Sequence, residues 1–372
     1  MRIDTFKLEE WMNLYCPNAK YDLTTTCINP LSIRDLVNIC EITSKLDIFE
    51  TKLSYGEIQG SIRLKNAIKN LYTNQSLKNI TITHGAIGAN QLVYESLLEK
   101  GDDVLVFIPT YQQHYSIPKA LGANVNFLVL KEENKWIPNL KDLESKLTKR
   151  TKIICLNNPN NPTGSVIPDN ILEKIVEIAK NNNSWILADE VYRGLTFSEN
   201  PYSKSIADIY EKGISVGSMS KTYSLPGLRV GWVCTREDLI SEINKHREYN
   251  TISISPLDDY FSAIALENKE KIARRNFQII KNGLNILNNW LNEEIYIKII
   301  PPQGGTTVLA RYKKDIPSKT LCREIFTKTG VLLLPGETME MEGYVRIGFC
   351  AEPEALTTGL KEFSSFIRKI KN

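Results

Sequence analysis

Between residues 80 and 234, short apolar runs rich in β-branched residues alternate with longer segments whose apolar residues recur at helical spacing. Alternation of this kind is typical of a largely parallel sheet that is covered by helices. The pattern predicts strands at 80–83, 103–108, 125–130, 152–156, 185–188, 214–217 and 230–234, with helices at 87–99, 112–121, 140–148 and 168–181. We therefore expect an α/β fold that binds its ligand beyond the carboxyl ends of the strands.

The segments outside this core predict two domains, which is also the default for a chain of 372 residues. A short helix at 7–15 and an extended polar segment at 24–32 form an N-terminal arm, which we expect to pack on a partner or to cover a site. Other helical patterns lie at 33–47, 60–72 and 256–291, and strands are expected at 306–310, 331–334 and 345–349. We expect the arm (1–32) to join a small α+β domain (283–372), with a large α/β domain over 33–282.

Composition and charge restrict the partners and the cellular location that we expect for this chain. A net charge of +3 without a run of like charges argues against nucleic acid. The seven cysteines are odd in number and form no CxxC pair, which indicates reduced thiols in a cytoplasmic protein. The start has no apolar signal segment, and no apolar run approaches membrane-spanning length. At the other end, 361–371 predicts a helix packed on its own domain rather than a basic helix on a membrane surface.

One lysine carries the strongest chemical signal. Lys221 follows an apolar run, stands between Ser220 and Thr222, and precedes Arg229 by eight residues. Partial burial there is expected to lower its pKa toward the amine that attacks a carbonyl, and an arginine fork with serine hydroxyls suits a phosphate. A lysine in a polar surface turn is the alternative reading of the same residues.

Two further motifs end predicted strands. In residues 157–164, NNPNNPTG, the prolines hold an irregular turn that presents the Asn161 amide. In residues 185–195, Asp189 ends an apolar strand, where a carboxylate is costly to bury unless it is paired. Alone, the first motif could be an ordinary turn, and the second a helix cap or ion pair.

Together these three motifs resemble the class I/II aminotransferase family of pyridoxal phosphate (PLP) enzymes, fold type I. The resemblance implies that the large domain binds PLP, with Lys221 attached to the cofactor, Asp189 on its pyridine nitrogen, and Asn161 and Tyr192 on its phenolic oxygen. It also implies a phosphate site made by Ser218, Ser220, Arg229 and the turn Gly85, Ala86 and Ile87, although the family often has serine or threonine beside that glycine.

Further expected site residues come from the same resemblance. Tyr111 corresponds to an aromatic residue that stacks on the ring, with a core aromatic as the alternative. Tyr55 resembles a tyrosine that reaches the phosphate of a neighbouring subunit, which implies a homodimer with composite sites. Arg346 is expected to bind the substrate α-carboxylate as a fork, with Asn161 and, more weakly, Asn29 in the same region.

The reaction is a separate question, because these motifs serve several PLP reactions. Tracts at 8–11, 247–257 and 303–307 resemble cyclases of the capreomycidine synthase type, which act on hydroxylated arginine. Tracts at 330–336 and 346–349 add to this resemblance, although ordinary aminotransferases share versions of both. This implies loss of a side-chain hydroxyl and closure of a cyclic guanidine. Nothing in the sequence selects among Glu9, Glu10 and Glu57 as partners for the guanidinium group.

Two other functions are also compatible with the sequence. The tract 189–192 reads as an ordinary aminotransferase, which would transfer an amino group to a 2-oxo acid. A PLP-fold protein that only binds or regulates is a third hypothesis, against which the presence of Lys221 argues. The sequence has no GxGxxG, no phosphate loop and no HExxH, and its three histidines are far apart, so no metal site is expected. His114 could line the pocket or face solvent.

Overall fold

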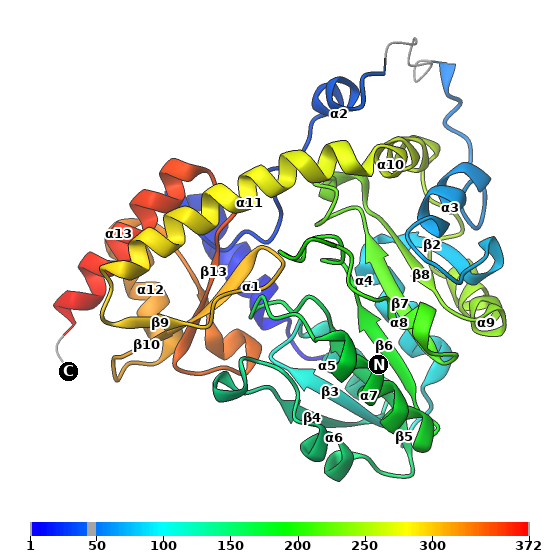
Figure 1. Cartoon of the computed structure of the whole chain (residues 1–372), viewed down its shortest axis with the longest axis horizontal. Helices are drawn as coiled ribbons and strands as arrows, with labels where there is room; N and C mark the ends of the chain where they lie inside the picture. Colours follow the sequence, from blue (N-terminus) through cyan, green and yellow to red (C-terminus); the bar gives the residue numbers. More distant parts are fainter. Residues whose placement is uncertain (1, 43–49, 371–372) are drawn as a thin grey trace.

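The chain folds around a large sheet and a small sheet, joined by one long helix. The computed structural model describes residues 2–42 and 50–370. The long helix is α11 (Lys269–Asn292), which runs from the large sheet to the small one (Figure 1).

The large sheet has seven strands and lies among helices. Its strands are β2 (Ile80–His84), β3 (Asp103–Ile108), β4 (Asn124–Val129), β5 (Thr151–Asn157), β6 (Trp185–Asp189), β7 (Gly213–Ser218) and β8 (Val230–Cys234). Its helices are α3 (Ile62–Lys69), α4 (Gly85–Leu97), α5 (Gln113–Ala120), α6 (Leu140–Lys146), α7 (Asp169–Asn181), α8 (Ile206–Ile209), α9 (Glu237–Glu248) and α10 (Pro256–Glu267).

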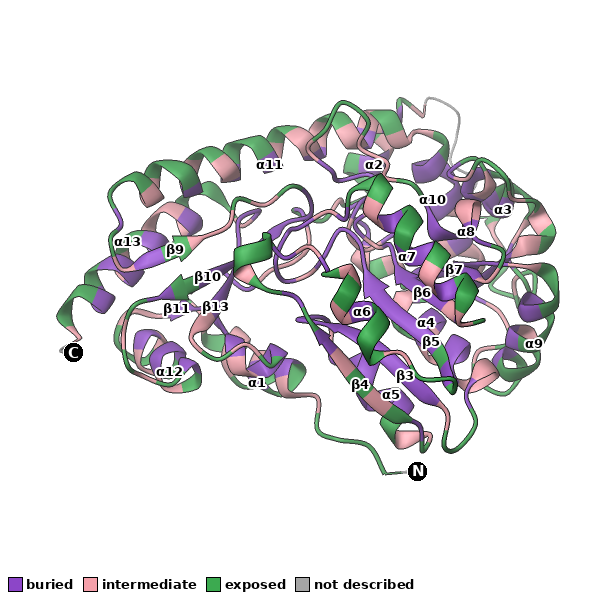
Figure 2. Cartoon of the chain, turned by 60° about the horizontal axis from the view of Figure 1, so that its bottom comes forward, coloured by how far each residue is buried: buried purple, intermediate pink, exposed green. Residues whose placement is uncertain are grey.

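The strand order is β2-β8-β7-β6-β5-β3-β4, and only β8 runs antiparallel to its neighbours. Every residue of β3 is buried, as expected for a parallel strand that is covered on both faces (Figure 2). On α7, Leu172, Ile175, Val176 and Ala179 recur at helical spacing and are buried. The prediction of a mostly parallel α/β sheet is confirmed.

The small sheet contains β9 (Ile297–Ile299), β10 (Thr307–Tyr312), β12 (Leu334–Pro335) and β13 (Tyr344–Gly348). Helices α12 (Ser318–Thr329) and α13 (Pro353–Lys369) complete this part of the chain. The apolar face of α13 is buried in the main core, and its Phe363 ring stacks on Trp290 of α11, with 6.1 Å between the ring centroids. This last helix therefore packs on its own chain.

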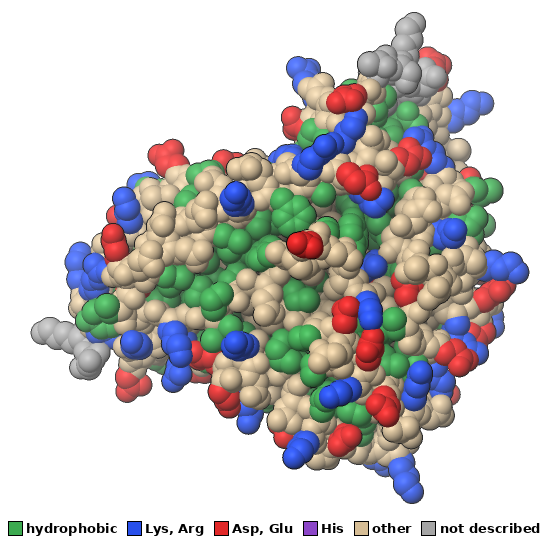
Figure 3. Space-filling model, in the orientation of Figure 1, with side chains coloured by type: hydrophobic (Ala, Val, Ile, Leu, Met, Phe, Trp, Pro, Cys, Tyr) green, Lys and Arg blue, Asp and Glu red, His purple; other side chains and the backbone are tan. Residues whose placement is uncertain are grey.

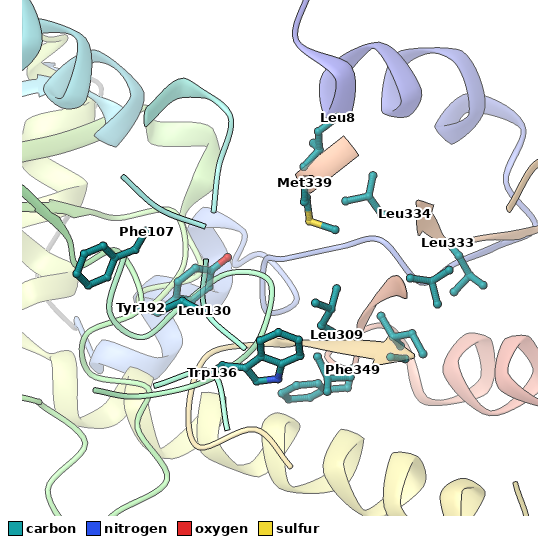
Figure 4. Packing of buried hydrophobic residues seen from close by; sticks show 14 of the residues in the cluster. Leu8, Phe107, Leu130, Trp136, Tyr192, Leu309, Leu333, Leu334, Met339 and Phe349 are labelled. Carbon is teal, nitrogen blue, oxygen red and sulfur yellow. The ribbon is translucent and has the colours of Figure 1, made fainter. Parts of the chain in front are cut away.

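The N-terminal arm packs on the small sheet. It contains α1 (Lys7–Tyr15) and β1 (Tyr21–Asp22), whereas the next helix, α2 (Ile33–Cys40), follows the arm and packs against α10 and α11. Strand β1 pairs in parallel with β11 (Val331–Leu332), and Trp11 Nε1 donates to the Leu333 carbonyl at 3.1 Å. Leu8 of α1 lies beside Met339 in the same core (Figure 4). These contacts hold residues 22–27 over the end of the large sheet.

Some predicted boundaries were wrong. The helix expected over 256–291 is two helices, because Asn268 leaves the helical backbone region and its side chain bonds the Ile264 carbonyl. The strand expected over 331–334 is divided at Leu333, because β11 pairs with β1 in a separate two-stranded sheet and β12 belongs to the small sheet. Ser61 caps α3, so the helix expected from 60 begins at Ile62. The helix expected over 33–47 ends at Cys40, and residues 43–49 lie outside the described part.

Surface and thiol features are those of an ordinary globular chain. On the face drawn in Figure 3, lysine and arginine side chains are interspersed with acidic ones. All seven cysteines are free thiols. No helix among the described residues is both long and apolar enough to cross a membrane.

Candidate active site

A cavity of about 400 Å³ lies at the carboxyl ends of the large-sheet strands, between them and the N-terminal arm. Most residues that the sequence singled out line it: Lys221, Asp189, Asn161, Tyr192, Tyr111, Ala86, Ile87, Ser218, Ser220, Arg229 and Arg346. The fold therefore brings these side chains together from six separate segments of the chain. Tyr55 and Asn29 are not among the lining residues.

Lys221 lies three residues beyond the end of β7 and is partly buried. Its Nζ donates to Thr26 Oγ1 at 2.5 Å and lies 3.3 Å from Cys27 Sγ, both from the arm. Burial opposes the charge on this amine, but the neighbouring Tyr192 and Cys27 side chains outweigh it and raise the pKa of Lys221. The expectation of a lowered pKa was therefore wrong, because sequence reasoning did not foresee groups that stabilise the ammonium form.

Asp189 ends β6 and is buried beneath the cavity. Its Oδ2 lies 3.2 Å from both Asn90 Nδ2 and His114 Nε2, and its Oδ1 accepts from the Val191 amide at 3.2 Å. Burial opposes a charge on His114, but Cys155 and the Asp189 carboxylate raise its pKa to about 10. These three contacts fix the orientation of the carboxylate at the floor of the cavity.

The turn after β5 connects this carboxylate to the opposite wall. Asn157 Nδ2 donates to the Asp189 carbonyl at 2.8 Å, and its Oδ1 accepts from the Asn161 amide at 2.6 Å. Asn161 Oδ1 in turn accepts from Arg346 Nη1 at 3.1 Å. Nearby, the Tyr192 hydroxyl is buried and has no hydrogen-bond partner within the described residues.

Arg346 lies on β13 and is almost completely buried. Its Nη2 donates to the Thr24 carbonyl at 2.8 Å, whereas its Nε has no partner in the described part of the chain. Burial lowers the pKa of this guanidinium. A buried donor without a partner is costly, so this group is suited to an anionic ligand.

The wall opposite Arg346 has the features of an anion site. Helix α4 begins at Gly85, and the amides of its first turn have no partner within the helix. Gly85 has a φ of +64°, and a β-carbon there would lie 2.9 Å from Arg229 Nη2. Ser218, Ser220 and Arg229 line the same end of the cavity.

Tyr111 extends the cavity toward the arm. Its hydroxyl donates to Glu9 Oε1 at 2.8 Å, and its ring lies 4.8 Å from that of Phe6 between centroids. Burial and the Glu9 carboxylate raise the pKa of the Tyr111 phenol. The partner Glu9 lies on α1, more than a hundred residues away in sequence.

Two predicted residues lie elsewhere. Asn29 does not line the cavity, because its amide donates to Glu352 at 2.9 Å and its carbonyl accepts from Arg275 at the surface. Tyr55 is 82% exposed. His114 is fully buried behind Asp189, so it neither lines the cavity nor faces solvent.

Several cavity residues gave no recognisable sequence signal. Asp22, Thr26 and Cys27 reach the cavity only because β1 pairs with β11, a contact between residues about 310 apart. Asn90 on α4 could have been noticed as a polar residue on an apolar helix face. Glu190, which the sequence left unassigned, is buried and accepts from Ser215 Oγ at 2.7 Å and the Ile206 amide at 2.8 Å.

These residues fit pyridoxal phosphate. The unpartnered Tyr192 hydroxyl is a donor suited to a phenolic oxygen, and the fixed Asp189 carboxylate is suited to a protonated ring nitrogen. Arg229 Nη2 packs so closely on Gly85 that a β-carbon there would lie only 2.9 Å away, and both residues belong to the part of the chain that is suited to the phosphate group. The partly buried Lys221 amine lies in the same cavity.

Sequence comparisons agree with this fit. The profile of the family described as aminotransferase class I and II matches residues 28–363. The chain is 30% identical to capreomycidine synthase of Streptomyces vinaceus over 362 residues, or 96% of this chain and 92% of that one. It is 27% identical to aspartate aminotransferase of Thermotoga maritima over 326 residues, 85% and 84% of the two chains.

Structure comparisons give the same fold. A PLP-dependent aminotransferase from Streptococcus suis 89-1591 superposes with a TM-score of 0.95 at 41% identity, covering 100% of both chains. The PLP-dependent cyclase OrfR superposes with a TM-score of 0.90 at 25% identity, covering 99% of this chain and 98% of that one. The chain is therefore a PLP-dependent enzyme and belongs to the class I and II aminotransferase family.

Proposed function

We propose that this enzyme acts on hydroxyarginine, expels the side-chain hydroxyl and closes a cyclic guanidine amino acid. The observation that carries the proposal is the convergence of Lys221, Asp189 and Arg346 on one cavity. These groups suit an aldehyde cofactor, its ring nitrogen and a substrate α-carboxylate. The similarity to capreomycidine synthase over 96% of the chain supports the choice of cyclisation.

Within this proposal, the chain holds the cofactor at three points. Asp189, oriented by Asn90 and His114, holds a proton at the ring nitrogen. Asn161 and Tyr192 donate to the phenolic oxygen. The phosphate group is bound by Ser218, Ser220, Arg229 and the first-turn amides of α4 at Gly85, Ala86 and Ile87, with Tyr111 against the ring.

The chain also moves the reacting proton. When bound, PLP supplies an electron-withdrawing ring that weakens the bond between the substrate α-carbon and its hydrogen. Lys221 Nζ accepts that proton as a general base, and Thr26 at 2.5 Å orients the amine. Arg346 holds the α-carboxylate through its Nε, for which the described residues provide no partner.

Cyclisation then balances as the loss of one water molecule. The α-carbon loses a proton to Lys221, and the side-chain hydroxyl leaves with a proton as water. A guanidinium nitrogen bonds to the carbon that the hydroxyl left and gives up a proton, while the α-carbon regains one. The α-amine is retained throughout.

Transamination is the second candidate, and the 41% identity to the Streptococcus suis aminotransferase favours it. The two reactions differ in the fate of the α-amine. We would incubate the purified holoenzyme with hydroxyarginines and with common amino acids and identify the products by mass spectrometry. The proposal expects a product that keeps its amine and lacks one water. An oxo acid with accumulation of pyridoxamine phosphate would instead establish an aminotransferase.

We further propose a homodimer. The apolar residues Leu53, Tyr55 and Tyr249 are 81%, 82% and 96% exposed. They belong to two segments that meet where the Gly56 backbone lies against the Ile254 carbonyl. Covering such residues with a second copy would bring Tyr55 toward the partner's phosphate site. Light scattering should then give twice the chain mass of 42.3 kDa, and a single-chain mass would contradict the dimer. The cytoplasmic location and the domain limits at 32 and 282 stay predictions.

A further inference from the structure

Two carboxylates in the cavity have no role in the chemistry described above. Glu9 and Asp22 line the cavity beside the cofactor and carboxylate groups. We infer that Glu9 and Asp22 form the subsite that binds the cationic end of the substrate side chain, and so select a guanidinium-bearing amino acid. This inference rests on the proposed amino acid substrate, and it names the part of the cavity that reads its side chain.

Glu9 has one carboxylate oxygen available to a ligand. Its Oε1 accepts from the Tyr111 hydroxyl at 2.8 Å, which fixes the carboxylate, and its Oε2 accepts no hydrogen bond within the described residues. Glu9 is exposed, whereas its neighbour Leu8 is packed beside Met339 in the core (Figure 4). Helix α1 is therefore anchored, and Glu9 lies where a long side chain would extend.

Asp22 is fixed in a comparable way. Its Oδ1 accepts from the Thr24 amide at 2.8 Å and from Thr24 Oγ1 at 2.5 Å. Among the described residues, its Oδ2 accepts only a weak hydrogen bond from the Cys16 thiol, with Sγ at 3.9 Å. Because Asp22 belongs to β1, its backbone is held by the pairing with β11.

Neither carboxylate has a cationic partner of its own. No lysine, arginine or histidine nitrogen in residues 2–42 and 50–370 lies within 4.0 Å of Glu9 or Asp22. Both carboxylates nevertheless act electrostatically on Arg346, whose Nε is buried, unpartnered and part of the same cavity wall. The same cavity thus offers a donor with no partner in the described chain and two carboxylates that pair with no cation there, an arrangement that matches an amino acid with a carboxylate at one end and a cation at the other.

The charges also disfavour an acidic substrate. Three cationic side chains line the described cavity: Lys221, Arg229 and Arg346. The proposed function assigns one to the aldehyde, one to the phosphate and one to the α-carboxylate. A second substrate carboxylate would meet Glu9 and Asp22 and be repelled.

Binding to the holoenzyme tests the subsite directly. Arginine and citrulline differ at the side-chain end, where the neutral urea of citrulline replaces the guanidinium. We would titrate both ligands against wild type, Glu9→Gln, Asp22→Asn and, as a matched control, Glu10→Gln, following the absorbance of the bound cofactor. Glu10 is also exposed and adjacent on α1, but it does not line this cavity.

We expect wild type to bind arginine about tenfold or more tightly than citrulline. Glu9→Gln and Asp22→Asn should each weaken the binding of arginine about tenfold and that of citrulline less than about twofold. Glu10→Gln should bind both ligands with wild-type affinity. Equal affinity of wild type for the two ligands would overturn the subsite. An equal loss for both ligands in Glu9→Gln would also overturn it, and that variant decides the matter if Asp22→Asn does not fold.

Products separate this inference from the proposed reaction. If hydroxyarginine yields an oxo acid while Glu9→Gln selectively weakens arginine binding, the proposed cyclisation is wrong and the proposed subsite is supported. If hydroxyarginine is cyclised while Glu9→Gln leaves the arginine-to-citrulline ratio unchanged, the subsite fails and the reaction stands.

Discussion

His114 Nε2 lies 3.2 Å from Asp189 Oδ2, and the ring is fully buried behind the carboxylate. Its other nitrogen, Nδ1, lies 3.0 Å from the Tyr94 hydroxyl, so a charged ring donates on both sides. His114 therefore holds the Asp189 carboxylate from behind and leaves its cavity side open to a ring nitrogen.

The His114–Asp189 pair predicts a pH dependence of stability. The pKa of His114 is raised from 6.5 to about 10 in the folded protein, so its stabilising contribution is complete below pH 6.5 and is lost as the pH rises through 10. In the cofactor-free protein, the free energy of unfolding should fall across this range by at most about 1.4 kcal/mol per pH unit. His114→Gln should remove this fall. Urea unfolding at several pH values would measure it, with His246→Gln, at an exposed position, as the control.

The glycine at the start of α4 predicts a selective effect on cofactor affinity. Gly85→Ala introduces a β-carbon 2.9 Å from Arg229 Nη2 at a φ of +64°, so the anion site must distort. We expect PLP binding to weaken by about 2 kcal/mol, within the range for strained backbone positions. Gly88→Ala, three residues along the helix, meets nothing closer than 3.7 Å and should keep wild-type affinity. Equal losses in both variants would argue against a role for this turn.

The planar guanidinium of Arg346 predicts that its replacement lowers amino acid affinity and that a lysine at this position cannot restore it. Lysine lacks the planar donor pair, so Arg346→Lys should weaken amino acid binding by about 2–3 kcal/mol and leave PLP affinity nearly unchanged. Spectral titration with an amino acid would measure both. Arg311→Lys, at an exposed position on the neighbouring strand, is the matched control. Unchanged substrate affinity in Arg346→Lys would show that the buried guanidinium has only a structural role.

The contacts of the N-terminal arm predict that the free energy of unfolding and the affinity of the cavity for substrate change together. Trp11→Phe removes the donor to the Leu333 carbonyl and should lower the free energy of unfolding by about 1–2 kcal/mol, because that acceptor is left buried. Since α1 also carries Glu9, substrate affinity should fall more than PLP affinity. Thermal unfolding and ligand titration of the same preparation would compare the two effects. A stability loss with unchanged substrate affinity would argue that α1 does not position the cavity wall.

Much of the cavity could be predicted from local sequence. The alternating pattern located the strand ends, and Asp189, Asn161 and Lys221 follow strands whose carboxyl ends meet at one edge of the sheet. The spacing of apolar residues, every second residue in strands and every 3.6 residues in helices, is enough to locate the strand ends.

The arm side of the cavity could not be predicted in this way. Asp22, Thr26 and Cys27 depend on the pairing of β1 with β11, whose register is set by contacts between distant segments. The raised pKa of Lys221, which Tyr192 and Cys27 cause together, depends on the same pairing in part, because Cys27 comes from this arm. Asn268 divides the long helix through a side-chain bond to its own backbone, which periodicity does not register.

The most direct test is borohydride reduction of the holoenzyme followed by peptide mapping. The account predicts that the reduced cofactor is attached to Lys221 and that Lys221→Ala carries none. An adduct on another lysine, or no adduct at all, would contradict it.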